Sequence, residues 1–342
     1  MGMSGQEIVN NSFVLDACTY VEFGFKGCHE IIHNSGLDAF FLTTPYSPIG
    51  FQDTVRSMGA IYRLCDKPET KVKIIRNIGD LAAAKSEGKL GLIFAFQDPK
   101  PIENSLDNLR ILYEMGLRVV QMSYMLTNFI GSGCCETHDA GLTDFGYEVL
   151  GELNRLGIIV DIAHCGTKTS LDTLKSSKAP VNITHANPRA LSDNCRNHTD
   201  EELKLIAQTG GVVGVCPWGP IAWKPHLRHQ PTMDEFLEII DYVVKLVGID
   251  HIGYGTDYIL DEGDNMSEKT AGLYPQVAKL YNDTHGLDNS TRFVKGFKGS
   301  PEIVNVAEEL LKHGYKEGEI EKFLGGNWLR VMKEVWKQIS YC

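Results

Sequence analysis

Two short apolar stretches decide the fold of this chain: IIVDIA (158–163) and PVNIT (180–184), each followed directly by a histidine, His164 and His185. Both stretches are rich in β-branched residues and end at turns, so they predict buried parallel strands. The carboxyl ends of parallel strands form the edge at which α/β barrels and open sheets place their chemistry. Two neutral imidazoles one strand apart at that edge can hold a borderline metal such as zinc. The alternative is that each histidine bonds only to a loop carbonyl.

Strand-like and helix-like segments alternate along almost the whole chain. Gly116, Gly157 and Gly210 stand where the left-handed ends of helices favour glycine, just before the next strand-like segment. Eight alternations in about 260 residues predict a (β/α)8 TIM barrel. A doubly wound open sheet is the alternative, although it usually has fewer strands and often a glycine-rich phosphate loop. The expected strands are 13–18, 37–43, 90–97, 117–123, 158–163, 180–184, 211–216 and 251–256, and the helices between them include 53–64, 105–115, 145–156, 168–175 and 200–208.

A single domain is expected over residues 1–342, because no low-complexity linker or internal repeat divides the chain. The length of 342 residues is sufficient for one large α/β core. The final stretch, 288–342, has helical character, so we expect additional C-terminal helices packed against the outside of the barrel.

The composition is that of a globular protein with an acidic surface: 43% hydrophobic residues, 23% charged residues and a formal net charge of −11. This charge argues against nucleic acid or an anionic membrane as a partner. No run of about 18 apolar residues predicts a membrane span, and the N-terminus lacks the features of a signal peptide. We therefore expect a cytoplasmic protein with a small-molecule substrate, and the sequence leaves open whether it forms a homo-oligomer.

Nine cysteines are scattered through the chain without the spacing of a disulfide framework. An odd, irregular set of this kind is typical of reduced thiols in a cytoplasmic protein. Cys134 and Cys135 form a vicinal pair in a loop, but no CxxC partner occurs elsewhere, which argues against a zinc knuckle.

Polar or metal-binding residues end most of the expected strands. One such residue alone would be unremarkable, but together they outline a polar, metal-capable pocket at one rim. The set comprises Cys18 with Tyr20, Gln97, Tyr124, His164, His185 and Asp257.

Two charged residues suggest specific roles. Asp257 follows a run of small residues, and beside a bound metal its carboxylate could accept a proton from a metal-activated water. Its alternative role is to cap the following helix. Arg196 lies in the loop after His185, where a guanidinium could bind a substrate carboxylate through two hydrogen bonds. Its alternative role is an ion pair with a surface aspartate.

At these residues the sequence resembles the renal (membrane) dipeptidase family of amidohydrolase-type barrels. The resemblance extends over nearly the whole chain, and such an extended series of motifs is specific for the family. The activity that it implies is zinc-dependent hydrolysis of dipeptides by a hydroxide held between two metals. The motifs that carry it are AIYR (60–63), GKL (88–90), GLTDFG (141–146), ELNRLG (152–157), VDIAH (160–164), THAN (184–187), RN (196–197), GTD (255–257) and NWLRV (327–331).

Four site residues agree with the family pattern. The resemblance implies that His164 and His185 are ligands of one metal. It assigns Asp257 to the catalytic proton and Arg196 to the substrate carboxylate.

Four other positions depart from the pattern. Where the family opens with His-x-Asp at the end of the first strand, this chain has Cys18 and Tyr20. Gln97 replaces the bridging glutamate, and Tyr124 replaces a histidine that contacts the substrate. These replacements fall on one side of the site.

The departures change the expected metal content. A two-metal cluster needs anionic ligands to balance about four positive charges, and a neutral amide such as Gln97 bridges poorly. We therefore expect the first metal position to be empty. The second position retains His164 and His185 and could be completed by Gln97, Asp257 or water, or by a thiolate from Cys18, so at most one zinc is expected.

Three functions remain open at this point. The first is a metal-dependent hydrolase that acts on a small carboxylate-bearing substrate with an amide or related bond. In that case Asp257, Tyr124 and Cys18 are the catalytic candidates, and Arg196, Tyr20 and Asn197 are the substrate-binding candidates. The second is a catalytically altered member of the family that binds a small ligand. The third is an ordinary zinc dipeptidase.

Overall fold

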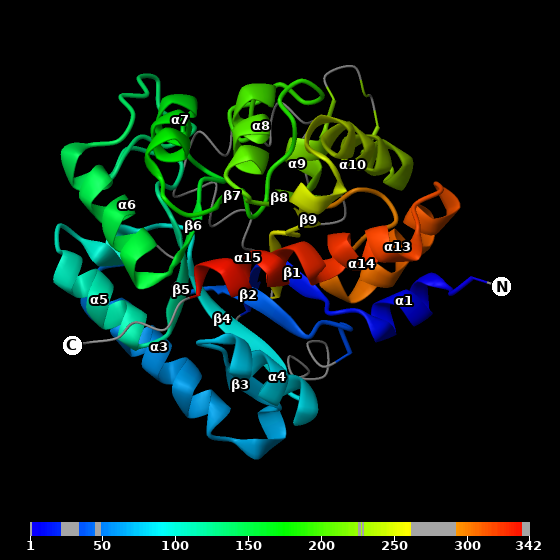
Figure 1. The fold of residues 1–342 in the computed structure, drawn as a ribbon, viewed down its shortest axis with the longest axis horizontal. Helices are drawn as coiled ribbons and strands as arrows, with labels where there is room; N and C mark the ends of the chain where they lie inside the picture. The colour runs from blue at the N-terminus through cyan, green and yellow to red at the C-terminus, as the bar shows by residue number, and fades with distance from the viewer. Residues whose placement is uncertain are drawn as a thin grey trace.

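The structure is a computed structural model that describes residues 2–21, 34–44, 49–224, 227, 229–260 and 292–336. Short strands alternate with helices that surround them (Figure 1). The strands are β1 (Leu15–Val21), β2 (Ala39–Thr43), β3 (Val72–Ile74), β4 (Leu90–Phe96), β5 (Leu117–Gln121), β6 (Ile159–Asp161), β7 (Val181–Asn182), β8 (Val213–Val215), β9 (Ile252–Tyr254) and β10 (Tyr258–Leu260). The helices are α1 (Gly5–Asn11), α3 (Phe51–Cys65), α4 (Ile78–Ser86), α5 (Leu106–Glu114), α6 (Asp144–Leu156), α7 (Thr167–Ser176), α8 (Asp200–Gln208), α9 (Gly219–Ala222), α10 (Met233–Val247), α13 (Ile303–Lys312), α14 (Glu317–Glu321) and α15 (Asn327–Val335).

The strands form a parallel α/β barrel, as the alternating sequence pattern predicts. Parallel pairing runs through the order β10-β1-β2-β4-β5-β6-β7. A parallel bridge from Ile183 to Val213 continues the ring to β8, which pairs with β9. All eight expected strands are found, and the short β3 is an addition that pairs outside the ring with β4. The prediction of a TIM barrel is confirmed.

The eighth strand of the barrel is divided into two parts. Its first part, β9, pairs with β8, whereas its second part, β10, pairs with β1. Between them, Asp257 has a φ of 53°, a left-handed backbone conformation that residues other than glycine rarely adopt. The carbonyl oxygen of Asp257 accepts a hydrogen bond from Arg292 Nη2 at 3.1 Å. The break closes the barrel and places Asp257 at the carboxyl end of β9.

Alternation along the strands separates two apolar layers. Phe40 and Leu42 of β2 belong to the large cluster shared with the surrounding helices. Their neighbours Ala39 and Phe41 belong to a second cluster with inward residues of the other strands. The second cluster also contains Trp328 of α15, whose ring lies 5.6 Å from the Phe41 ring, centroid to centroid. Burial of both layers is the main force that holds the barrel together.

The C-terminal helices take two positions. Helix α13 packs beside α1 and α10 on the outside. Helix α15 instead covers the amino-terminal end of the barrel, where its apolar face meets the inward residues that begin β1 and β2 (Figure 1). The described part of the expected extension is not helical at 292–299, where Phe293 forms an antiparallel bridge with Trp218. Helical structure begins at Ser300.

Among the described residues, no helix has the length and apolar character needed to cross a membrane.

Candidate active site

His164 and His185 meet at the carboxyl ends of β6 and β7. Both side chains are buried, and their Nε2 atoms lie 3.0 Å apart. Burial lowers the pKa of His164 well below its usual range, and it lowers the pKa of His185 to about 3. Both rings are therefore neutral at physiological pH, which is the form in which imidazole binds metals.

The tautomer of His185 follows from its neighbours. The Thr184 hydroxyl donates to Asp161 Oδ2 at 2.6 Å and lies 2.8 Å from His185 Nδ1. Because a hydroxyl has a single proton, its oxygen must accept the hydrogen bond from Nδ1–H of His185. The lone pair of His185 is then on Nε2, which faces His164. A hydrogen bond of this kind to the other ring nitrogen is what orients metal-binding histidines in proteins.

Asp257 and Cys18 lie next to His185. Ligand atoms of Cys18, His185 and Asp257 all lie within 4.8 Å of one another, and Cys18 Sγ is 3.6 Å from Asp257 Oδ1. Burial raises the pKa of the Cys18 thiol well above its usual value, and the nearby Asp257 carboxylate raises it further. Without a bound cation, Cys18 is therefore a neutral thiol.

Gln97 lies on the Cys18 side of the site. Its Nε2 donates to Cys18 Sγ at 3.1 Å and to Thr43 Oγ1 at 2.9 Å. Tyr20 is partly buried on β1, in register with Ile259 of β10. Gln97, at the position of the family's bridging glutamate, is thus bonded to the thiol of Cys18.

Tyr124 and Arg196 border the histidine pair. The Tyr124 ring lies 4.3 Å from the His164 ring, centroid to centroid, at an angle of 36°. The buried Arg196 guanidinium donates to two carbonyl oxygens, that of Ala163 and, at 3.1 Å, that of His185. Its positive charge contributes to the lowered pKa of both histidines. Arg196 Nε is buried without a hydrogen-bond partner among the described residues, so a donor remains available for a ligand.

Asn197 is held within its own loop. Its Nδ2 donates to the carbonyl oxygens of Ser192 at 2.8 Å and Ile221 at 2.9 Å, and its Oδ1 accepts from the Asn187 backbone at 3.1 Å. Both amide hydrogens are used in this way. The Asn197 side chain thus joins its own loop to α9, and its part in substrate binding stays a prediction.

The described residues include donors that fit a metal ion. Two neutral imidazoles with a nearby carboxylate and thiol form a donor set suited to zinc. Gln97 is neutral and already bonded to Cys18 and Thr43, so the bridging carboxylate that a second ion needs is missing.

Comparison with known proteins decides the family. The sequence model of the membrane dipeptidases (peptidase family M19) matches residues 38–289 and 283–340. The chain belongs to the membrane dipeptidase family. Membership makes it a metallohydrolase and confirms the resemblance that its motifs indicate.

Solved structures agree with this assignment. An amidohydrolase from Pseudomonas aeruginosa is 33% identical, with 98% of this chain and 100% of that chain covered and a TM-score of 0.85. The probable dipeptidase PvdM from Pseudomonas aeruginosa is 22% identical, with 97% of each chain covered and a TM-score of 0.78. A metallopeptidase from Rhodobacter sphaeroides, solved with a phosphinate mimic of the dipeptide L-Ala-D-Ala, is 18% identical, with 95% and 100% covered and a TM-score of 0.77.

Two buried aspartates support the site in this dipeptidase-family protein, and the motif analysis gave them no role. Asp161 accepts from the backbone and hydroxyl of Thr184, and Asp16 accepts in the same way from Thr256. Each aspartate also accepts from the amide two residues further along its own strand. We call each of these hydrogen-bonded Asp–Thr pairs a bracket. The threonine of one bracket directly precedes His185, and the threonine of the other directly precedes Asp257. A buried aspartate inside an apolar strand was the sequence signal that could have identified them.

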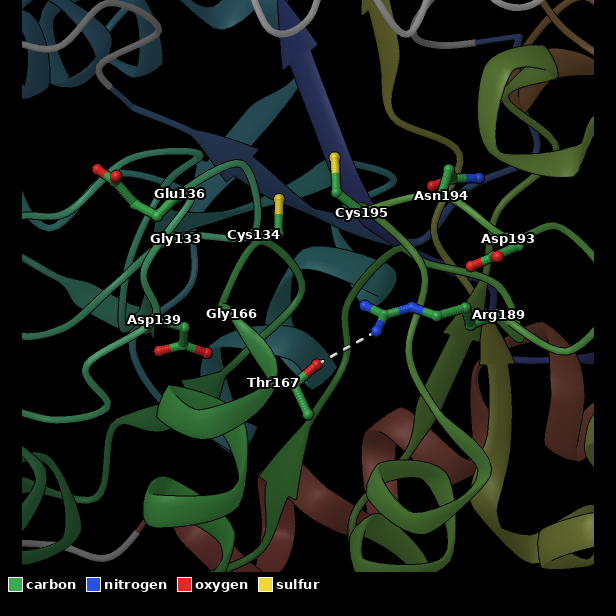
Figure 2. Close-up of a pocket in the computed structure, with 10 residues that line it drawn as sticks. All are labelled: Gly133, Cys134, Glu136, Asp139, Gly166, Thr167, Arg189, Asp193, Asn194 and Cys195. Carbon is green, nitrogen blue, oxygen red and sulfur yellow. Dashed lines mark hydrogen bonds between the residues drawn. The ribbon is translucent and has the colours of Figure 1, made fainter.

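A pocket of about 440 Å³ is lined by residues that follow β5, β6 and β7 (Figure 2). It does not include the predicted site residues, but several wall residues adjoin them in sequence: Gly166 and Thr167 follow His164, and Cys195 precedes Arg196. In Figure 2 a hydrogen bond of 3.3 Å joins Arg189 to Thr167 across the pocket. The complete lining is Gly133, Cys134, Glu136, Asp139, Gly166, Thr167, Arg189, Asp193, Asn194 and Cys195.

Proposed function

We propose that this membrane dipeptidase family member is a hydrolase with one zinc ion, acting on a small carboxylate-bearing substrate with an amide or related bond. The observation that carries the proposal is the 3.0 Å approach of the His164 and His185 Nε2 atoms, with the tautomer of His185 fixed by Thr184. Asp257, Cys18 or Gln97 would complete the ligand set. When bound, such an ion polarises a carbonyl group and lowers the pKa of a bound water.

The residues of the chain supply the other parts of the reaction. Asp257 is partly exposed at the break in the eighth strand, where its carboxylate can accept a proton from the attacking water. Arg196 offers a buried positive charge, and its free Nε can bind a substrate carboxylate. Tyr124, packed against His164, is placed to donate a proton or hydrogen bond to substrate oxygen. Tyr20 lines the substrate on the β1 side.

The alternative is an altered family member that binds a small ligand without hydrolysing it. Gln97 favours this function. It stands where a two-metal site needs a bridging carboxylate, but its neutral amide instead donates hydrogen bonds to Cys18 and Thr43. Cys18 could also act as a nucleophile, but its raised pKa makes the thiol a weak one.

Metal analysis tests the proposal. Protein purified without chelator is compared with a His164→Ala/His185→Ala variant, so that only metal held by the histidines is counted. The expected difference is about one zinc per chain. A difference near two would support an ordinary two-metal dipeptidase. A difference near zero, with no effect of added zinc on the melting temperature, would support the ligand-binding alternative.

A further inference from the structure

Three cysteine thiols from two separate loops meet beside the pocket. Cys134 and Cys135 lie in the loop after β5, and Cys195 lies in the loop after β7. The Cys135 and Cys195 Sγ atoms are 3.3 Å apart, those of Cys134 and Cys135 are 3.9 Å apart, and all three lie within 4.8 Å of one another. Sulfur atoms that share one tetrahedral metal at a bond length of about 2.3 Å are separated by about 3.8 Å. The cluster therefore has nearly the dimensions of a metal site.

A fourth sulfur atom adjoins the thiols. Met125 Sδ lies 3.6 Å from Cys135 Sγ and 3.9 Å from Cys134 Sγ. Met125 is 3% exposed and has a φ of 54°, an unusual backbone conformation for a residue with a side chain. A Cβ on Gly133 would lie 2.2 Å from the Met125 carbonyl carbon, so only glycine allows the two loop segments to pack this closely. The loop thus holds a strained methionine against the two neighbouring cysteines.

We propose that Cys134, Cys135 and Cys195, with Met125 as a fourth and weaker donor, bind a soft cation with a filled d shell, such as Cu(I). Thiolate and thioether sulfur prefer soft cations, and a set of four sulfur atoms favours Cu(I) over harder ions. This site is separate from the histidine site and does not depend on the proposed hydrolase function.

The charges around the cluster suit a cation held by thiolates. Hydrogen bonds from the Cys134 and Cys135 thiols hold the pKa of Cys195 well below its usual value, and the charges of Arg196 and Arg189 lower it further. Cys195 therefore loses its proton more readily than Cys134 and Cys135, whose pKa values are raised. Binding of a cation by all three sulfur atoms as thiolates releases the protons that the thiols hold.

The pocket provides access for the ion. Cys134 and Cys195 belong to its wall, and Figure 2 shows their sulfur atoms pointing to the same side. The cluster also contacts the histidine site, because the Cys134 backbone amide donates to the His164 carbonyl oxygen at 2.8 Å. Arg196, which follows Cys195, donates to the His185 carbonyl oxygen. A bound ion would therefore join the two loops that support the histidines.

Competition for Cu(I) tests this proposal. Reduced, oxygen-free protein is titrated against the chromophoric Cu(I) chelator bicinchoninate. We expect the wild-type protein to retain one Cu(I) per chain that a Cys135→Ser/Cys195→Ser variant does not retain. A Cys65→Ser variant is the control, because it loses a thiol that belongs neither to the cluster nor to the histidine site, and it should retain Cu(I). Met125→Leu should weaken binding without abolishing it.

X-ray absorption spectroscopy of the copper-loaded wild-type protein identifies the atoms bound to copper. This measurement needs no variant, so it tests the proposal even if a variant fails to fold. The proposal predicts a first shell of sulfur. A shell of nitrogen or oxygen would overturn it, as would equal retention of copper by the Cys135→Ser/Cys195→Ser variant. The proposal would also be overturned if the purified protein contained a Cys135–Cys195 disulfide and bound no copper after that disulfide was reduced. Metal analysis of the histidine variant is unaffected by any of these outcomes.

Discussion

The Thr184 hydroxyl is the most informative single group to remove, because it connects Asp161 to His185. It donates to Asp161 Oδ2 at 2.6 Å and accepts from His185 Nδ1 at 2.8 Å. Thr184→Val keeps the shape of the side chain but leaves both buried partners without it. Loss of a partner costs about 1–3 kcal/mol for each buried polar group, and two groups are affected, so the free energy of unfolding should fall by about 2–6 kcal/mol. Because the ring of His185 is no longer oriented, zinc affinity should fall about 10- to 100-fold.

Chemical unfolding and competition with a chromophoric zinc chelator measure the two effects separately. Ser300→Ala is the matched control, because it removes a buried hydroxyl from Asp16, in the other bracket, without touching His185. It should lower stability but leave zinc affinity nearly unchanged. Thr184→Ser should restore both properties. If Thr184→Val binds zinc as tightly as the wild type, the bracket does not orient the ligand and the reasoning is refuted.

Three further predictions concern the site as a whole. In metal-free protein, the free energy of unfolding should decrease as the pH falls from about 6.5 towards 3, because unfolded histidines take up protons in this range while His185, with a folded pKa of about 3, does not. His185→Asn should weaken that dependence, measured by unfolding at a series of pH values, and the lowered pKa of His164 should account for part of what remains. Gln97→Glu combined with Cys18→His and Tyr20→Asp restores the family's ligand types and should raise the zinc content, as measured by elemental analysis; unchanged content would contradict our placement of the rim. A dipeptide panel should show hydrolysis far slower than that of a two-metal family member, and rapid turnover would contradict the one-metal proposal.

The barrel could be predicted because each of its eight strand positions contains a short, mostly apolar run between helix-like segments. The strand β3 was missed because it has only three residues, with Lys73 in the middle, and lies outside the ring. The division of the last strand was missed for a different reason. The left-handed conformation of Asp257 is imposed by pairing with two different neighbours, and periodicity in one strand carries no information about it.

Those parts of the candidate site could be predicted in which a residue's position along its strand determines where its side chain lies in the barrel. His164, His185 and Asp257 follow strand ends, so the barrel brings them to one rim. Cys18 was expected at the end of the first strand, but it lies in the middle of β1, which continues to Val21. The hydrogen bonds of Asn197 could not be predicted, because only the fold brings its partners Ser192, in the same loop, and Ile221, in α9, next to its side chain.

The sulfur cluster could not be predicted from the spacing of cysteines in the sequence. Cys134 and Cys135 form no CxxC pattern, and the third thiol comes from Cys195, 60 residues away. Only the folded barrel, which sets the loops after β5 and β7 side by side, brings the three together.

The paired Asp–Thr brackets suggest how this scaffold tolerates a change of chemistry. Asp16 with Thr256, and Asp161 with Thr184, tie neighbouring strands of the barrel together through hydrogen bonds that involve none of the reactive groups except His185. Replacement of a ligand such as histidine by Cys18 therefore leaves the frame intact. Directed evolution of new activities in this protein should vary the side chains between the brackets and leave the four bracket residues unaltered.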